Sequence, residues 1–279
     1  MPDRAFRPSG SAIKLGTMEQ PLSQSSLVPQ FADATEFPWS ASIARSRGVY
    51  GFNSLDTRAR SFNLIRGKLV ALRRERNWRM FGIVSATPGV GKSFVSASLS
   101  AAMSRDPRFL TTLVDLDLRR GTIADIFGIT PETGLAQFLE SPDSAADIPA
   151  FRPQSEQLVI IPTIPANIHS AELLANQKSG QMLQAMRSSD ESNFFLFDLP
   201  PVYANDDAST TIDHLDGYVF VVEESKTTRP EVETAIELLG RDRLAGVVLN
   251  KYRGGLMSEG RGVEDRYASD YYTQEPLEE

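Results

Sequence analysis

The chain has 279 residues, of which 41% are hydrophobic, and this length accommodates one α/β domain of ~200–250 residues plus tails. Its formal net charge of −7 argues against general nucleic-acid binding, and the absence of cysteine excludes disulfides, thiolate metal sites and cysteine nucleophiles. Only two histidines are present, which disfavours a histidine-based zinc site, and no apolar run approaches the ~20 residues that span a bilayer, so we expect a cytoplasmic protein without a transmembrane segment.

The N-terminal region, residues 1–57, is rich in serine and proline and shows no sustained hydrophobic periodicity. We predict a disordered or linker arm there. From about Ser61, apolar residues recur at the spacing of a helix, namely Phe62, Ile65, Leu69 and Leu72. The other faces of this predicted helix carry arginine and lysine, which either remain solvated or form a docking surface for an acidic segment or anionic lipid.

A glycine-rich loop lies between a predicted buried strand, residues 80–84, and a predicted helix, residues 93–103. The loop, residues 86–93, reads Ala-Thr-Pro-Gly-Val-Gly-Lys-Ser, and its strand–loop–helix setting separates a phosphate-binding loop (P-loop) from a chance match. The two glycines allow the backbone to turn successive N–H groups toward phosphate oxygens. Lys92 would reach the β- and γ-phosphates, and the Ser93 hydroxyl would ligate Mg²⁺. The motif predicts binding of a nucleoside triphosphate.

Beyond this loop, short apolar runs alternate with helical stretches. The apolar runs are expected to be buried strands, at residues 111–114, 158–161, 194–197, 218–222 and 246–249. Helices are expected over residues 171–188 and 230–239, the second with Thr228 and Glu231 at the spacing of a capping box. This alternation predicts an α/β fold over residues 58–256, with a doubly wound, mostly parallel sheet and helices on both faces.

Two of the predicted strands end in aspartates. Asp115 and Asp117 follow the strand at 111–114, and Asp198 follows the strand at 194–197. The carboxyl edge of an open α/β sheet is the edge where ligands bind. Phosphoryl transfer needs a carboxylate that holds the metal and another group that orients or deprotonates the acceptor. We therefore expect Asp198 in the first role and either Asp115 or Asp117 in the second.

Together these segments resemble the bacterial tyrosine kinases (BY-kinases) of capsule and exopolysaccharide synthesis, over roughly residues 58–272. Residues 85–93 are similar to the Walker A motif of that family, residues 115–120 to its distinctive Walker A′ motif, and residues 197–202 to its Walker B motif. Members of the family end in a tyrosine cluster. Here the tyrosines Tyr267, Tyr271 and Tyr272 lie in an acidic C-terminal tail, which we assign to residues 257–279.

The resemblance implies an ATP-dependent protein-tyrosine autokinase that uses Mg²⁺. The nucleotide would lie on the P-loop and its flank, at Pro88, Gly89, Val90, Gly91, Lys92, Ser93 and Phe94. The implied catalytic residues are Lys92, Asp115, Asp117 and Asp198, and the implied metal ligands are Ser93, Asp117 and Asp198. Asp115 would act near the acceptor hydroxyl as base or ligand, with its division of roles with Asp117 left open. Asn250 is expected either to read the base of the nucleotide or to be a buried turn residue. A C-terminal tyrosine of a neighbouring subunit would accept the γ-phosphoryl group.

The resemblance also implies partners. We expect a homo-oligomer that is activated by the cytoplasmic tail of a separate membrane adaptor or co-polymerase of polysaccharide export, and that is recruited in this way to the inner face of the membrane. Nucleic acid is not an expected partner. Members of the family carry an acidic residue and two arginines for ring assembly on the helix before the P-loop. Here Arg60, Asn63 and Arg66 occupy these positions, so only the last one matches.

Two alternatives remain open. A partition- or septum-type ATPase switches its dimerisation by hydrolysis, but those proteins carry a signature lysine early in the P-loop, where this chain has Ser85, Ala86 and Thr87. A nucleotide-binding regulatory subunit of a polysaccharide exporter, with weak kinase activity, is the other alternative. It is favoured by Arg60, which stands in place of the acidic assembly residue.

Overall fold

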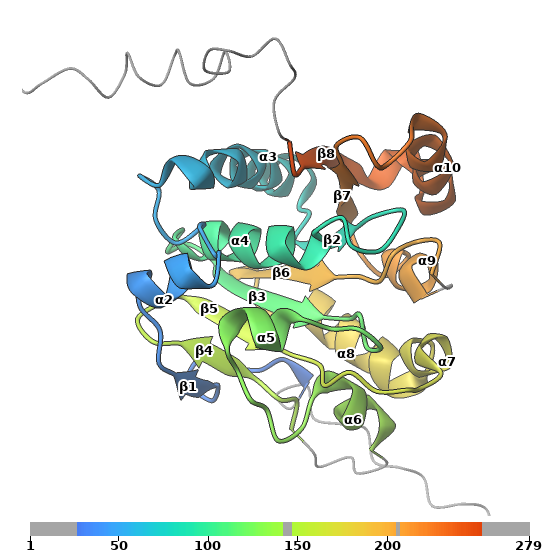
Figure 1. The fold of residues 1–279 in the computed structure, drawn as a ribbon. Helices are drawn as coiled ribbons and strands as arrows, with labels where there is room; N and C mark the ends of the chain where they lie inside the picture. Colours follow the sequence, from blue (N-terminus) through green and yellow to red (C-terminus); the bar gives the residue numbers. More distant parts are fainter. Residues whose placement is uncertain (1–26, 142–146, 205–206, 253–279) are drawn as a thin grey trace, which may run out of the picture.

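The continuous apolar runs of the sequence form the centre of one eight-stranded sheet (Figure 1) in the computed structural model, which describes residues 27–141, 147–204 and 207–252. The strand order is β1-β4-β5-β3-β6-β2-β7-β8. The strands are β1 (Thr35–Phe37), β2 (Met80–Val84), β3 (Leu110–Asp115), β4 (Phe151–Pro153), β5 (Leu158–Ile161), β6 (Asn193–Asp198), β7 (Gly217–Glu223) and β8 (Leu244–Asn250). From β5 to β8 all neighbours are parallel, whereas β4 is antiparallel to β5 and β1 is parallel to β4.

Helices cover both faces of this sheet, so the predicted doubly wound α/β fold is confirmed. One face is covered by α2 (Ala41–Ser46), α3 (Arg60–Arg76), α4 (Lys92–Ser104) and α5 (Ile123–Phe127). The other face is covered by α6 (Leu135–Glu140), α7 (Ser170–Leu174), α8 (Gln177–Ser188), α9 (Asp207–Ile212) and α10 (Arg229–Leu239). Two short 3-10 helices, η1 (Thr57–Ala59) and η2 (Arg241–Arg243), precede α3 and β8. No helix within the described ranges has the length and apolarity to cross a bilayer.

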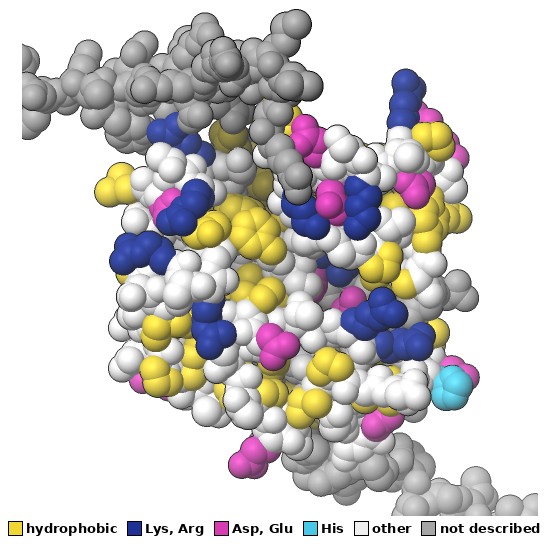
Figure 2. Space-filling view, viewed as in Figure 1, with side chains coloured by type: hydrophobic (Ala, Val, Ile, Leu, Met, Phe, Trp, Pro, Cys, Tyr) yellow, Lys and Arg dark blue, Asp and Glu magenta, His cyan; other side chains and the backbone are white. Residues whose placement is uncertain are grey.

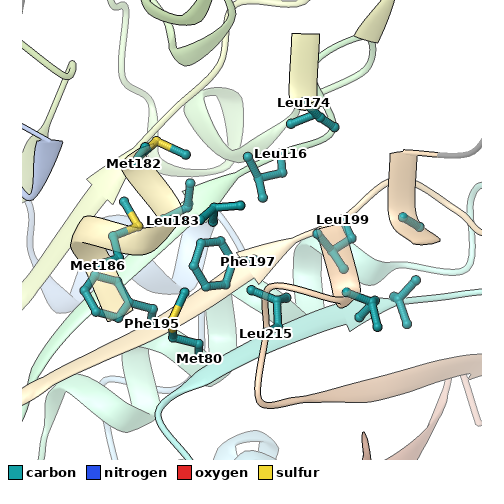
Figure 3. Packing of buried hydrophobic residues seen from close by; sticks show 14 of the residues in the cluster. Met80, Leu116, Leu174, Met182, Leu183, Met186, Phe195, Phe197, Leu199 and Leu215 are labelled. Carbon is teal, nitrogen blue, oxygen red and sulfur yellow. The ribbon is translucent and has the colours of Figure 1, made fainter. Parts of the chain in front are cut away.

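Alternate side chains of each central strand enter two separate hydrophobic cores, because successive residues of a strand point to opposite faces. In β6, Phe194 and Leu196 pack under α3 and α4, whereas Phe195 and Phe197 pack under α8. Figure 3 shows the second of these cores, in which Phe195 and Phe197 lie among side chains of α8 and of the loops that follow β3 and β6. A strand that is buried on both faces has to be apolar throughout, which is why these runs were recognisable in the sequence.

Two helical predictions have different outcomes. The capping box before α10 is confirmed, since the Thr228 hydroxyl caps the helix and the Glu231 carboxylate accepts from the Thr228 N–H at 2.7 Å. The single helix predicted over residues 171–188 is wrong, because the chain breaks between α7 and α8. Asn176 causes the break, since its side chain caps α8 by accepting a hydrogen bond from the Ser179 N–H at 2.8 Å.

The predicted disordered arm over residues 1–57 is wrong for residues 27–57, which belong to the folded domain; residues 1–26 lie outside the described part of the chain. Trp39 is only 6% exposed, and its ring contacts the rings of Phe37, Phe52 and Phe127 at centroid distances of 5.2–5.9 Å. Each such ring buries a large apolar area, which outweighs the polar composition around it. The segment therefore packs beside α4 and α5 as an integral part of one core.

The basic side chains of α3 are largely used within the fold. Arg66 forms an ion pair with Asp106 at 3.3 Å, and Arg73 donates to main-chain carbonyls of the loop before β6. The Arg76 guanidinium lies 5.0 Å from the centre of the Trp78 ring. Asn63, at one of the family's assembly positions, accepts a hydrogen bond from Arg105. These contacts leave α3 a weaker candidate for docking an acidic segment than its sequence indicates.

The close packing of the N-terminal segment on α4 is tested by Gly51→Ala. A Cβ at Gly51 would lie 1.9 Å from the Ser98 carbonyl oxygen and 2.5 Å from the Ala102 nitrogen. We expect this variant to lose about 1–3 kcal/mol of unfolding free energy in urea denaturation, because α4 has to move. The matched control is Gly67→Ala in α3, where a Cβ meets nothing within 4 Å and stability should be unchanged or rise by up to ~1 kcal/mol. Equal unfolding free energies of the two variants would contradict the close packing of Gly51 against α4.

Candidate active site

The P-loop connects β2 to α4 with the geometry that its glycines predict. Gly89 (φ +78°) and Gly91 (φ +91°) both occupy the left-handed region, which side chains other than glycine rarely adopt. No side chain caps the start of α4 at Gly91. The first N–H groups of this helix therefore remain available to an anion, and the helix dipole favours negative charge at the same place.

A cavity of about 860 Å³ opens at the carboxyl edge of the sheet above this loop. It is lined by Pro88, Gly89, Gly91, Lys92, Ser93, Phe94, Asp117, Arg119, Arg120, Thr122, Ile126, Pro200, Pro201 and Ala204. Figure 2 shows the hollow, with basic and acidic side chains around it. Six of the seven predicted nucleotide-binding residues from Pro88 to Phe94 thus line one space. Val90 does not, because its side chain is 1% exposed and belongs to the core between the sheet and α4.

Lys92 lies between two of the predicted carboxylates. Its Nζ is 3.7 Å from Asp117 Oδ2 and 3.9 Å from Asp198 Oδ1. All three residues are buried, with Asp198 at 0% exposure. Ser96 in α4 donates a hydrogen bond to Asp198 Oδ1 at 2.9 Å, while the other oxygen, Oδ2, has no hydrogen-bond partner within the described residues. A buried carboxylate oxygen without a partner is unfavourable, so this atom is suited to a bound cation.

Asp115 occupies a different environment from Asp117. It pairs in register with Asp198 on the neighbouring strand, but it is fully buried and does not line the cavity. Its two oxygens accept hydrogen bonds from the main-chain N–H groups of Asp117 (3.3 Å) and Ile123 (3.2 Å). Burial, and next the charge of Asp198, raise the pKa of the Asp115 carboxyl well above its usual value. In this structure Asp115 holds the loop between β3 and α5.

The loop over Asp115 is closed by a glycine. A Cβ at Gly121 would lie 2.5 Å from Asp115 Oδ2 and 2.1 Å from a methyl carbon of Thr163. Only glycine fits between these groups without displacement of the loop. Gly121 thus lies directly on the buried carboxylate.

Asn250 lies behind the P-loop and not in the cavity. Its side-chain amide donates a hydrogen bond to the Val90 carbonyl at 2.8 Å, and it fills the space that a Cβ at Gly91 would need. The next residue, Lys251, donates to the Gly89 carbonyl at 2.7 Å and forms an ion pair with Glu223 at 3.1 Å. The end of β8 therefore fixes two carbonyls of the P-loop from outside. Asn250 is half-buried at the end of β8 and does not line the cavity, so both sequence interpretations of this residue stay predictions.

Several residues of the cavity were not nominated from the sequence. Arg119 and Arg120 follow Asp117 directly and were part of the quoted motif, so their position was a usable signal. Thr122, the N-cap of α5, Ile126 within that helix, and Pro200, Pro201 and Ala204 after β6 complete the lining. Lys251 had no signal of its own beyond adjacency to Asn250. The three tyrosines Tyr267, Tyr271 and Tyr272 lie outside the described residues.

The environment of Asp117 predicts a pH dependence of stability. Burial is the main cause of its raised pKa, and Lys92 opposes the shift without cancelling it. The pKa of the Asp117 carboxyl is therefore higher in the folded protein than in the unfolded chain. The wild type loses stability as the pH rises from the pKa of the unfolded chain to that of the folded protein. Asp117→Asn should therefore raise the unfolding free energy of the nucleotide-free protein at neutral pH, and this gain should vanish in acid, below the pKa of an unfolded aspartate. Urea titrations of the wild type and the variant at several pH values measure this difference in unfolding free energy. A difference that grows toward acid pH would contradict the raised pKa of Asp117.

Comparison with known proteins places this site in context. No protein-family model matches the chain. The putative tyrosine-protein kinase EpsB of Ralstonia nicotianae is 30% identical over 204 residues, which are 71% of this chain and 26% of EpsB. The tyrosine-protein kinase YwqD of Bacillus subtilis is 28% identical over 179 residues, which are 63% of this chain and 73% of YwqD. The chain thus spans about a quarter of EpsB but most of YwqD.

Solved structures give the same picture of the fold. The kinase domain of the Escherichia coli tyrosine kinase ETK superposes with a TM-score of 0.62 at 23% identity, covering 81% of this chain and 94% of that domain. The septum site-determining protein MinD of Pyrococcus horikoshii, in complex with Mg-ADP, has a TM-score of 0.52 at 22% identity, covering 69% of this chain and 76% of MinD. At these identities the likeness concerns the fold alone. The chain is thus similar in sequence to bacterial tyrosine kinases and has the fold of their kinase domains.

Proposed function

We propose that this chain is an ATP-dependent protein-tyrosine kinase that phosphorylates the C-terminal tyrosines Tyr267, Tyr271 and Tyr272 of a neighbouring copy. The observation that carries the proposal is the position of Lys92, on the P-loop and between two carboxylates from adjacent strands. The names of the sequence relatives EpsB and YwqD, both tyrosine-protein kinases, support the choice of tyrosine as acceptor.

The residues present fit ATP and Mg²⁺. The open N-terminus of α4 and the turns at Gly89 and Gly91 suit the phosphates. Ser93 and Asp198 would hold Mg²⁺, and the unpartnered oxygen of Asp198 supports this assignment. Asp117, the third ligand implied by the resemblance, is assigned to the acceptor instead. Magnesium binds through one or two carboxylates together with phosphate oxygens, and when bound it would neutralise charge on the phosphates.

The transfer itself requires little covalent chemistry from the protein. The tyrosine oxygen forms a bond to the γ-phosphorus, the bond from that phosphorus to the β–γ bridging oxygen breaks, and ADP leaves with that electron pair. Lys92 offsets negative charge on the phosphates. Of the two candidate aspartates, Asp117 lines the cavity and Asp115 does not, so we assign Asp117 to orient the acceptor and take up its proton, and Asp115 to position the loop.

The wider biological role rests on the family resemblance. We propose that the kinase acts in the cytoplasm, as a homo-oligomer, on the polymerisation and export of a capsular or extracellular polysaccharide. A membrane adaptor or co-polymerase would activate it through a cytoplasmic tail and recruit it to the inner face of the membrane.

A switch ATPase is the second candidate, because the fold is shared with MinD. Such an enzyme would hydrolyse ATP without forming phosphotyrosine. The sequence Ser85-Ala86-Thr87, which lacks the signature lysine of the partition and septum ATPases, argues against it. Formation of phosphotyrosine would indicate the kinase, whereas release of free phosphate without phosphotyrosine would indicate the switch ATPase.

The kinase is tested by incubating the full chain with ATP and Mg²⁺, with and without an adaptor tail, and locating phosphate by mass spectrometry. We expect phosphate on Tyr267, Tyr271 or Tyr272, and a loss of at least about 100-fold in Lys92→Ala, the size seen when one electrostatic contact to a transition state is removed. Lys68→Ala, on the surface of α3, is the matched control and should retain activity. Hydrolysis without phosphotyrosine would favour the switch ATPase and contradict the kinase.

Asn250→Ala distinguishes support of the P-loop from recognition of the base. If the amide only fixes the Val90 carbonyl, its loss should weaken ATP and GTP binding by the same factor, about tenfold for one partly buried hydrogen bond. Isothermal titration with both nucleotides measures this. A change in the ratio of the two affinities would show that Asn250 reads the base.

A further inference from the structure

Two adjacent arginines that line the cavity have no side-chain partner among the residues that the structure describes. Arg119 and Arg120 follow Asp117 at the end of β3, both are exposed, and both line the cavity. Within the described residues, neither guanidinium forms an ion pair or a side-chain hydrogen bond. They line the same cavity as the P-loop residues Pro88 and Gly89.

The chain carries a net charge of −7, so carboxylates are available to pair with its arginines. Most of the other described guanidinium groups contact carboxylates, main-chain carbonyls or aromatic rings of the fold. The ion pairs include Arg66–Asp106, Arg108–Asp106, Arg152–Glu36, Arg187–Asp216, Arg229–Glu233 and Arg243–Asp213. Two neighbouring unpaired cations at the mouth of a site form a surface suited to an anionic partner.

The nucleotide already has a separate binding region. The P-loop, the start of α4 and the buried Lys92 supply positive potential there. Arg119 and Arg120 are exposed, and they line the cavity together with the buried prolines Pro200 and Pro201 and the exposed Ala204. A cavity lining that combines these apolar residues with two exposed cations fits an aromatic side chain flanked by carboxylates.

The C-terminal tail of the chain has this chemistry. Glu264, Asp265 and Asp270 lie within three residues of Tyr267. In an extended segment, with about 3.3 Å per residue, such carboxylates lie about 7–10 Å along the chain from the tyrosine. Arginine is the residue best suited to bind them, since its planar group matches a carboxylate with two hydrogen bonds.

We propose that Arg119 and Arg120 bind the carboxylates that flank the acceptor tyrosine, so that the site selects acidic tyrosine-containing segments such as residues 264–272 of a second copy of this chain. This inference rests on the proposed kinase function and adds the substrate class and the residues that select it. The arginines act on the binding of the acceptor and leave the affinity for ATP to the P-loop.

The test uses the full chain with Tyr267, Tyr271 and Tyr272 changed to Phe, so that phosphate can only be transferred to an added peptide. One peptide has the sequence of residues 260–275, and a second carries Glu264→Gln, Asp265→Asn and Asp270→Asn. Both are assayed with the parent enzyme and with Arg119→Gln/Arg120→Gln. The matched control is Arg74→Gln/Arg241→Gln, which removes the same charge near the amino-terminal ends of β2 and β8, the opposite edge of the sheet.

We expect the KM of the acidic peptide to rise about fivefold to tenfold in Arg119→Gln/Arg120→Gln, as for two exposed ion pairs of good geometry. The neutralised peptide should have the higher KM with every enzyme, and the KM for ATP should change less than about twofold. Fluorescence anisotropy of the labelled acidic peptide should show the same loss of affinity without catalysis, and a weaker affinity of the parent enzyme at high salt.

Three outcomes would overturn the inference. The first is equal KM values for the two peptides with the parent enzyme. The second is a rise in the KM for ATP with that of the peptide unchanged, which would place the arginines on the nucleotide. The third is equal loss in the control pair, which would reflect net charge alone. Absence of any peptide phosphorylation by the parent enzyme, with peptide binding retained and dependent on the arginines, would instead contradict the proposed kinase.

Discussion

The structure depends on one electrostatic constraint, the burial of several carboxylates with a single lysine at one edge of the sheet. Asp115 and Asp198 are paired in register on adjacent strands and are both fully buried, and Asp117 follows two residues later. Lys92 lies within 4 Å of two of the three. Burial disfavours each charge, so the pKa values of Asp115 and Asp117 are both raised. The cluster therefore has a deficit of positive charge, which a metal ion held with a nucleotide would reduce.

The fold retains this unfavourable cluster because other contacts hold its members in place. Ser96 binds one oxygen of Asp198, and two main-chain N–H groups bind Asp115. From the opposite side, Asn250 and Lys251 fix the carbonyls of Val90 and Gly89. Since those carbonyls are bound outside the loop, its N–H groups can face the cavity. A rigid phosphate cradle of this kind loses little entropy when it binds a ligand, which is how a preorganised site contributes to affinity.

How much of this could be predicted from the sequence depended on whether the signal was local. The central strands are continuous apolar runs, and the P-loop is one contiguous motif, so both were recognised. β1 and β4 have three residues each, too few for a periodic pattern, and were missed. The sequence of residues 27–57 predicts a disordered arm, because Phe127 in α5, which helps to bury Trp39, is far from it in sequence. The break at Asn176 was missed because a cap inside a helical pattern resembles an ordinary polar residue.

The different positions of Asp115 and Asp117 show the same limit within the site. A strand-end pattern assigns both residues to the carboxyl edge of the sheet, and it cannot tell which one reaches the cavity. That outcome is decided by the loop after β3, which turns back over Asp115 because Gly121 leaves room between that carboxylate and Thr163. The same turn carries Arg119 and Arg120 to the lining of the cavity. One short loop thus buries a carboxylate, exposes the next one to the cavity and sets two cations beside it, so the acidic inner part and the basic rim of the site have a common structural origin.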